Sequence, residues 1–193
     1  MQTDLLAPQI ASLDLTLFMR EALYEAEQAG LAGELPIGAV VVIEGRIVSR
    51  GRAQHQAKQS QLRHAELGAL LDGGTALWEN YKNAILFTTC EPCPMCLGAA
   101  VMADVPHIIF AAHDEVVHSR QTVATNPYVR RHIQSYYGGV LEAQARALIA
   151  RFNPAMLAYI TSQRQEHATR AMQPHSASGS APPPEATPSG EQI

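Results

Sequence analysis

The chain has 193 residues, of which 47% are hydrophobic and 17% are charged, and its formal net charge at pH 7 is −4. This length and composition predict one soluble globular domain and exclude a fibrous or wholly disordered chain. No apolar run approaches the ~18 residues that cross a bilayer, and the N-terminus lacks the basic start and apolar stretch of a signal peptide. Its three cysteines suit a reducing compartment better than a disulfide scaffold. We therefore expect a cytoplasmic protein with no membrane partner.

The charge balance bears on the size of the substrate. Proteins that bind nucleic acid usually carry a basic stripe that displaces counterions from phosphates. This chain is acidic overall and contains only two lysines, Lys58 and Lys82. Its arginines form small groups near residues 46–52 and 120–131. The balance favours a small substrate over a large RNA.

Hydrophobic periodicity predicts helices and strands that alternate along the chain. Apolar residues at helical spacing begin after Asp14, a candidate N-cap, and the helix ends at Gly30 and Gly33. Further helices are predicted at 64–71, 94–103, 142–152 and from 154 to about 167. Apolar, often β-branched runs predict strands at 37–43, 46–49, 84–88, 107–111 and 138–141. Residues 51–62 are interpreted as a loop across the mouth of a site, and residues 112–137 as a loop with a short helix.

Alternating strands and helices predict a three-layer α/β/α domain over residues 14–167. Residues 1–13 are expected to form a loose start. Residues 168–193 are rich in Pro, Ser and Ala, with no lysine or arginine after Arg170. Such a segment cannot bury enough apolar surface to order itself, so we expect a disordered tail.

Two short motifs carry the chemistry: His64-x-Glu66, and Pro92-Cys93 followed by Cys96. Zinc binds imidazole nitrogen and thiolate sulfur in a tetrahedron, and a catalytic site uses three protein ligands and leaves the fourth position for water. His64, Cys93 and Cys96 supply three such ligands. Glu66 then remains free to handle the protons of that water.

The predicted elements explain how these side chains meet. Cys93 and Cys96 fall at the first turn of the helix that starts at residue 94, where unpaired N–H groups and the helix dipole favour thiolates. His64 opens another helix. Residues two apart on a helix point ~200° away from each other, so His64 and Glu66 converge only on an object beyond the helix end. A zinc ion between two helix N-termini is such an object.

Other interpretations of the cysteines stay open from the residues alone. A Cys-x-x-Cys pair also occurs in structural zinc sites and in redox pairs. Three cysteines three apart, starting at Cys90, could hold an iron–sulfur cluster with His64 as the fourth ligand. That cluster would leave Glu66 and Pro92 without a role. Cys90 is instead interpreted as a small buried residue at a strand end.

Together, the two motifs resemble the cytidine/deoxycytidylate deaminase superfamily, whose zinc enzymes carry His-x-Glu and Pro-Cys-x-x-Cys. Within it, residues 34–40 and 110–114 resemble the bacterial tRNA adenosine deaminases, and residues 89–99 are as similar to the bacterial guanine deaminases. The resemblance covers residues 14–160. It implies a cytidine-deaminase-like fold with a five-stranded mixed sheet, a zinc cofactor, hydrolytic deamination, and a homodimer in which each site is partly walled by the neighbouring chain.

Four residues beside the motifs are candidates for substrate contact: Gln54, Ala65, His113 and Asp114. Asp114 matches a family position at the end of the fourth strand, where the resemblance implies contact with the substrate; a turn-forming role is the alternative. His113 lies near the same rim. One departure matters, because relatives that act on bases usually carry asparagine eleven positions before the zinc histidine, where this chain has Ala53. The chain therefore differs from the family pattern at position 53, where relatives contact the substrate, while its two zinc-site motifs match the pattern.

The main hypothesis is a zinc-dependent hydrolytic deaminase of a small nucleobase, nucleoside or related aminated heterocycle. Bound zinc lowers the pKa of water to about 7, so that hydroxide attacks the ring carbon, and Glu66 carries protons to the ring nitrogen and the leaving amine. The alternative within this class is a tRNA-specific adenosine deaminase, which converts adenosine to inosine. The alternative from another class is a zinc-stabilised binding module without catalysis, for which the free carboxylate of Glu66 would have no use.

Overall fold

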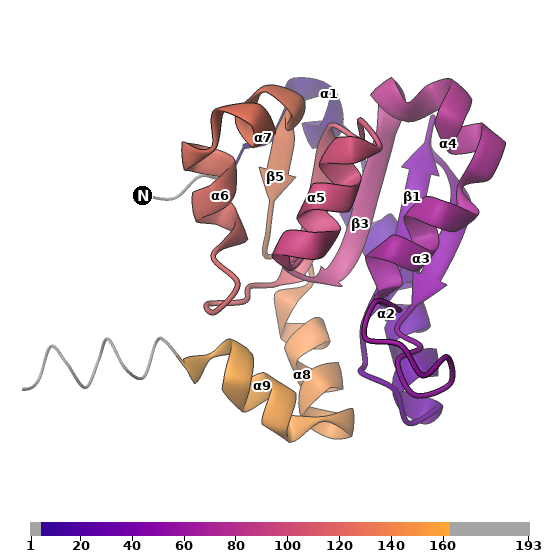
Figure 1. Ribbon diagram of the computed structural model, residues 1–193, viewed down its shortest axis with the longest axis vertical. Helices are drawn as coiled ribbons and strands as arrows, with labels where there is room; N and C mark the ends of the chain where they lie inside the picture. The colour runs from indigo at the N-terminus through magenta and orange to yellow at the C-terminus, as the bar shows by residue number, and fades with distance from the viewer. Residues whose placement is uncertain (1–4, 163–193) are drawn as a thin grey trace, which may run out of the picture.

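The computed structural model describes residues 5–162, and within that range five strands form one mixed sheet (Figure 1). The strands are β1 (Gly38–Ile43), β2 (Arg46–Arg52), β3 (Ala84–Cys90), β4 (His107–Ala112) and β5 (Ser135–Tyr137). They lie in the order β2-β1-β3-β4-β5. Strand β1 runs antiparallel to both β2 and β3, whereas β4 runs parallel to β3 and β5. The predicted five-stranded mixed sheet is confirmed.

Helices cover both faces of this sheet, as Figure 1 shows. Helices α2 (Leu15–Leu31) and α8 (Glu142–Phe152) pack on one face, and α3 (Ala65–Asp72) and α5 (Pro94–Met102) lie side by side on the other. The shorter helices of the described range are α1 (Pro8–Ala11), α4 (Gly74–Asn80), α6 (Ser119–Thr125), α7 (Pro127–His132) and α9 (Pro154–Ile160). Across residues 5–162, no helix combines the length and the apolarity needed to span a bilayer. The predicted α/β/α layering is confirmed.

The three central strands are buried on both faces, which explains their uninterrupted apolar sequences. Every residue of β1, β3 and β4 is buried. The ring of Phe87 in β3 packs against Phe18 of α2, with 5.3 Å between ring centroids. Strands covered by helices on both sides need no alternation of polar and apolar residues. This core holds β3 in place, and β3 leads directly into the cysteine motif.

Two glycines let helices approach the sheet backbone on opposite faces. A Cβ atom on Gly38 of β1 would collide with the carbonyl oxygen of Ala22 in α2. A Cβ atom on Gly51 of β2 would collide with the carbonyl oxygen of Ala65 and lie 2.5 Å from the nitrogen of Ala69, both in α3. Only glycine allows backbones to approach this closely. The contact at Gly51 sets the position of the first turn of α3.

Local signals set several helix ends as predicted. Asp14 caps α2, because its Oδ1 accepts hydrogen bonds from the backbone nitrogens of Thr16 at 3.1 Å and Leu17 at 3.2 Å. Pro94 occupies the first position of α5, where its missing N–H removes no helical hydrogen bond. Helix α3 ends before Gly73, as expected.

The prediction of a fifth strand at 138–141 is wrong, because β5 occupies Ser135–Tyr137. The chain leaves the sheet at Gly138, where a Cβ atom would collide with the ring of Phe110, and Gly139 turns it with φ +88. The preceding segment holds two short helices, α6 and α7, rather than a loop with one helix. A three-residue strand is too short to show periodicity in the sequence.

The expected loose start is corrected for residues 5–13. Leu5 pairs with Tyr136 in an isolated bridge, the Ala7 nitrogen donates to Ser135 Oγ at 3.0 Å, and Ile10 is buried. The segment is held because its apolar side chains pack in and against the hydrophobic core. At the other end, residues 163–167 of the predicted last helix and the tail predicted at 168–193 lie outside the described residues.

Replacing Gly51 with alanine is expected to destabilise the fold by about 1–3 kcal/mol, because the added methyl group collides with the backbone of α3. The matched control is Gly68→Ala in α3 itself, where the new Cβ would lie 3.7 Å from Gly51, an ordinary contact distance. Alanine favours a helix over glycine by about 1 kcal/mol, so this control should be neutral or stabilising. Urea unfolding measures both. Equal free energies of unfolding for the two variants would refute the close-packing explanation.

Candidate metal centre and active site

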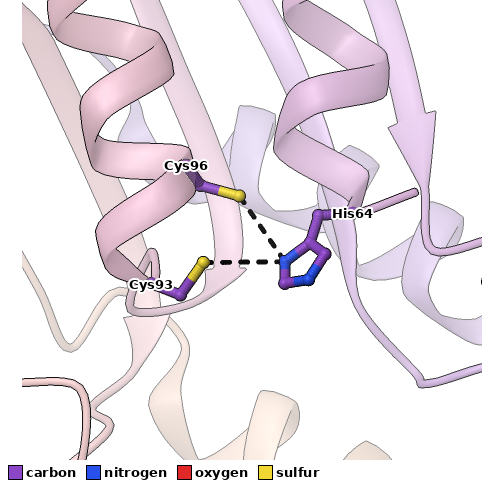
Figure 2. Close-up of side chains that lie close together, drawn as sticks. All are labelled: His64, Cys93 and Cys96. Atoms are coloured by element: carbon purple, nitrogen blue, oxygen red, sulfur yellow. Dashed lines mark hydrogen bonds between the residues drawn. The ribbon is translucent and has the colours of Figure 1, made fainter. Parts of the chain in front are cut away.

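Two helix N-termini bring three potential metal ligands together (Figure 2). His64 is the N-cap of α3, Cys93 is the N-cap of α5, and Cys96 lies in the first turn of α5. The Nδ1 atom of His64 lies 3.7 Å from Cys93 Sγ and 3.6 Å from Cys96 Sγ. All three ligand atoms lie within 4.8 Å of one another. Cys93 and Cys96, which follow His64 by 29 and 32 residues, therefore converge with it on one point.

These distances fit a tetrahedral zinc ion. Zn–S bonds of about 2.3 Å and a Zn–N bond of about 2.1 Å, set at a tetrahedral angle, separate nitrogen from sulfur by about 3.6 Å. The observed separations of 3.6 and 3.7 Å agree with that value. Imidazole and thiolate are also the donors that zinc prefers. Cys90 is buried at the end of β3 and is not part of the ligand group found among the described residues.

The two cysteines of the group titrate differently. A hydrogen bond from Cys96 lowers the pKa of Cys93 to about 4, and the neighbouring His64 acts in the same direction. The same bond raises the pKa of Cys96, and burial adds to the effect. Zinc binds thiolates, so the cysteine that holds its proton more strongly, Cys96, would lose that proton when zinc binds.

Glu66 lies in the first turn of α3, with its side chain buried beside the ligand group. It is only 3% exposed, and Cys96 Sγ donates to its Oε2 at 3.5 Å. Burial raises the pKa of this carboxyl. His64 and Glu66 reach the same point because the backbone of His64 is extended, with φ −74 and ψ 153, rather than helical. This is the convergence beyond the helix end that the spacing predicts.

A cavity of about 100 Å³ lies beside the ligand group. Apolar side chains form much of its wall, namely Leu35, Ile37, Ala53, Ala65 and Met156. The other lining residues outside the ligand set are His55, Glu66, Cys90, Glu91 and Asp114. A ligand here meets mainly apolar surface with a few placed polar groups, which is typical of small-molecule sites.

A buried carboxylate holds the loop that covers this cavity. Glu34 accepts hydrogen bonds from the backbone nitrogens of Gln56 at 2.9 Å and Ala57 at 2.7 Å. Burial opposes ionisation of Glu34, but these hydrogen bonds outweigh it and lower the pKa of the carboxyl. In the same loop, the ring of His55 packs edge-on against His64, with 5.0 Å between centroids. The loop is therefore a fixed wall of the site.

A second buried carboxylate, Glu91, holds the opposite wall. Its Oε2 accepts from the Asp114 nitrogen at 3.2 Å, and its Oε1 accepts from the Arg120 nitrogen at 3.2 Å and from Tyr136 Oη at 3.3 Å. The guanidinium Nε of Arg120 lies 3.3 Å from the same Oε1. Because Glu91 stands two positions before Cys93, these bonds tie the cysteine motif to the segment that follows β4.

Three of the residues predicted to contact substrate lie at or near the cavity. Ala65 and Asp114 line it. Asp114 also acts as a turn former, because its Oδ1 accepts from the nitrogens of Val116 at 2.8 Å and Val117 at 3.2 Å. Gln54 lines a neighbouring polar groove instead.

The fourth, His113, does not line the cavity. Its Nδ1 lies 3.2 Å from Glu142 Oε2, so its side chain is engaged with α8. Sequence reasoning assigned no site role to Glu91 or Met156, which both line the cavity. Glu91 offered a signal, since a carboxylate between a buried strand and a metal motif has no solvent to face. Met156 offered none, because it reaches the site only through tertiary packing.

Comparison with known proteins agrees with this geometry. Residues 13–112 match the cytidine and deoxycytidylate deaminase zinc-binding region. Over 140 residues the chain is 36% identical to the tRNA-specific adenosine deaminase of Bacillus subtilis (strain 168), which covers 70% of this chain and 86% of that protein. A solved structure from a study of A-to-I editing by tRNA:A34 deaminases at the wobble position of transfer RNA is 30% identical, with a TM-score of 0.60, over 69% of this chain and 99% of that one.

A guanine deaminase from Nitrosomonas europaea also superposes, with a TM-score of 0.60, over 80% of this chain and 97% of that one. Its identity is 19%, so this likeness shows the fold alone. The family match spans both motifs and therefore all of His64, Glu66, Cys93 and Cys96. The chain belongs to the cytidine and deoxycytidylate deaminase family, and zinc is its cofactor.

Proposed function

We propose that this deaminase hydrolyses the exocyclic amine of a small nucleobase, nucleoside or related aminated heterocycle. The observation that carries the proposal is the buried carboxyl of Glu66, which lies beside the three-ligand group at the wall of a mostly apolar cavity. A zinc site that only stabilises a binding module has no use for such a carboxyl, and burying one without function is costly. The catalytic hypothesis therefore gives a role to Glu66, which a zinc-stabilised binding module leaves unexplained.

In this proposal, three residues bind zinc and a fourth, Glu66, transfers protons. Zinc held by His64, Cys93 and Cys96 supplies a Lewis acid that makes water nucleophilic at neutral pH. Glu66 takes one proton from the attacking water and delivers it to the ring nitrogen beside the amine-bearing carbon. It then carries the second water proton to the leaving amine, so that the products are the oxo heterocycle and ammonia. A positioned acid–base group contributes about 10²–10⁴ in rate.

The dimensions of the cavity support a small substrate. Its volume of about 100 Å³ is well below the roughly 300–1,000 Å³ of sites that hold drug-sized ligands. Met156 of α9 forms part of its wall, so this helix narrows the space. A single ring system suits such a cavity. The net charge of −4 agrees with a substrate that needs no phosphate clamp.

The second candidate is tRNA-specific adenosine deamination, favoured by the similarity to the Bacillus subtilis enzyme of that name. A groove beside the cavity also carries Arg50, Arg52 and Arg63, which could meet phosphates. Two of these cations are already paired, however: Arg50 Nη2 lies 2.7 Å from Glu21 Oε2, and Arg52 Nη2 lies 2.7 Å from Glu25 Oε2. This pairing reduces the positive charge that the groove offers to RNA. A small heterocycle therefore remains the preferred substrate class.

Two substitutions are expected to separate metal binding from chemistry. Cys93→Ala should lose zinc and activity together, because it removes one of three ligands. Glu66→Gln should keep zinc and fold but lose at least about 10² in turnover, because only proton transfer is removed. Elemental analysis measures zinc, with one ion per chain expected in the wild type, and ammonia release measures turnover.

The matched control is Cys90→Ala, since Cys90 precedes Cys93 by three positions but lies outside the ligand group. This variant should retain its zinc. Iron in the wild-type protein, full zinc occupancy in the Cys93 variant, or an unchanged turnover number in the Glu66 variant would each overturn the assignment.

Deamination of the preferred substrate should depend little on salt. An anticodon loop must be held through its phosphates, and log affinity then falls with log salt by about 0.7 per contact for a single strand. The panel comprises guanine, adenine, cytosine, their nucleosides, pterins, triazines and an anticodon stem-loop, assayed at low and physiological ionic strength. Efficient deamination of the stem-loop, weakening steeply as salt rises, would promote the second candidate.

We also propose that two chains pair through an apolar patch formed by Leu71, Trp78 and Met102. Leu71 and Met102 lie at the C-terminal ends of α3 and α5, opposite the metal ligands, so this pairing differs from the expected dimer in which the neighbouring chain walls each site. These side chains are 66%, 81% and 73% exposed, and they border a groove of about 450 Å³ over α3, α4 and α5. Exposed apolar patches of this kind mark association surfaces. Trp78 and the groove belong to the same patch. A twofold axis would therefore place Trp78 of each chain against the groove of the other.

Trp78→Glu is therefore expected to yield monomers, because a charge in an apolar contact is costly. Tyr24→Glu serves as the control, since Tyr24 is also exposed, at 56%, but lies on α2 across the sheet. Sedimentation equilibrium at micromolar concentration should give twice the chain mass of 20.9 kDa for the wild type and the control. A wild-type mass of one chain would reject the dimer.

A further inference from the structure

One residue of the cavity wall, His55, has a buried side-chain nitrogen that the protein leaves unpaired. Three buried side-chain nitrogen or oxygen atoms of the described residues have no hydrogen-bond partner: His55 Nδ1, Thr88 Oγ1 and Ser119 Oγ. Only His55 among these residues lines the cavity beside the ligand group. A buried donor or acceptor without a partner costs free energy that a bound ligand can recover.

The backbone around His55 is held on both sides. The Ala53 nitrogen donates to the Ile37 oxygen at 3.1 Å, and the Ser60 nitrogen donates to the His55 oxygen at 3.0 Å. The next two backbone nitrogens donate to the Glu34 carboxylate. The imidazole is further fixed by its edge-on contact with His64. Such a side chain is preorganised, so little conformational entropy is lost when it binds a ligand.

The three carboxyl groups of the cavity wall are already engaged. Glu66 faces the metal ligands and is assigned to proton transfer. Glu91 accepts three hydrogen bonds from neighbouring protein groups besides its ion pair with Arg120, and Asp114 accepts two from the turn that follows it. Ala53, two positions before His55, contributes only a methyl group to the wall. Among the histidine and carboxyl side chains that line the cavity outside the ligand set, His55 is therefore the one left to recognise a polar atom on a ligand.

We infer that His55 Nδ1 forms a direct hydrogen bond with a ring nitrogen or ring carbonyl of the substrate and thereby selects which heterocycle is deaminated. This inference rests on the proposed function for the identity of the ligand as an aminated heterocycle. A neutral imidazole carries one donor and one acceptor nitrogen, so the tautomer of His55 matches one class of ring edge and leaves the other unpaired. His55 is a specificity-determining residue and not a metal ligand, since the ligand group comprises His64, Cys93 and Cys96.

Three substitutions test this assignment in the full-length, zinc-loaded protein. His55→Phe keeps a ring against His64 and removes the nitrogen. His55→Asn places an amide near the position of Nδ1, whereas the longer side chain of His55→Gln places its amide beyond it. Gln56→Ala is the control, because the Gln56 side chain is exposed in the same loop while its backbone hydrogen bond to Glu34 is kept.

The readouts are zinc content, KM and kcat for ammonia release, and calorimetric binding of guanine, adenine, cytosine, pterins and triazines in a Glu66→Gln background. Each heterocycle that binds is paired with its deaza analogue, in which one ring nitrogen becomes C–H. We expect His55→Phe to retain zinc and to weaken binding about tenfold, chiefly in KM, which is the effect of one lost hydrogen bond in a buried site. One deaza analogue should weaken wild-type binding equally and weaken the Phe variant no further.

His55→Asn should recover most of the affinity and His55→Gln should not, a contrast that decides the matter even if the Phe variant fails to fold. Wild-type affinity in the Phe variant, or equal behaviour of the Asn and Gln variants, would overturn the inference. Loss of zinc in step with affinity would also overturn it, since His55 would then act through the metal site. A wild-type protein that binds a heterocycle through His55 without releasing ammonia would refute only the proposed function; one that binds none of the panel would refute both.

Discussion

The metal centre depends on the close contact between β2 and α3 at Gly51. The backbone of α3 lies so near the strand that no side chain fits between them, and α3 begins directly after His64. An outward shift of the helix would move the imidazole away from two sulfurs that lie 3.6 and 3.7 Å from it. Helix α5 is positioned independently, because the Glu91 nitrogen donates to the Ala112 oxygen at 2.8 Å and so extends the pairing of β3 with β4. The ligand group exists where these two separately held helix ends meet.

Three buried glutamates surround this centre, and their partners explain their different roles. Glu34 and Glu91 direct their oxygens at backbone N–H groups, which stabilises the loop over the cavity and the segment after β4. Glu66 faces the thiol of Cys96. Hydrogen bonds lower the pKa of Glu34 despite its burial, whereas burial raises the pKa of both Glu66 and Glu91. The partners therefore separate the roles: a carboxylate fixed by amide donors is a structural anchor, while Glu66, which faces a thiol of the metal-ligand group, suits proton transfer.

The sequence predicted those parts of the molecule in which local chemistry restricts the choice of residue. Buried strands must be apolar throughout, so β1, β3 and β4 were recognisable, and zinc accepts few side chains, so the ligand group was recognisable too. Strand β5 was misplaced because its three residues become a strand only by pairing with β4. Part of the wall of the cavity was missed for the same reason. Met156 reaches it from α9, and no local pattern records that contact.

In the proposed function, chemistry and substrate choice reside on different elements of this fold. The metal ligands and Glu66 lie at helix starts that the sheet holds in place, whereas Ala53 and His55 lie on a loop anchored separately by Glu34. A substitution in that loop changes which polar groups face the substrate without moving α3 or α5. With alanine at position 53, the loop presents His55 as its polar side chain at the cavity wall. If the polar group that contacts the substrate lies at position 55 instead of position 53, the enzyme can bind a different heterocycle while it retains the same zinc chemistry.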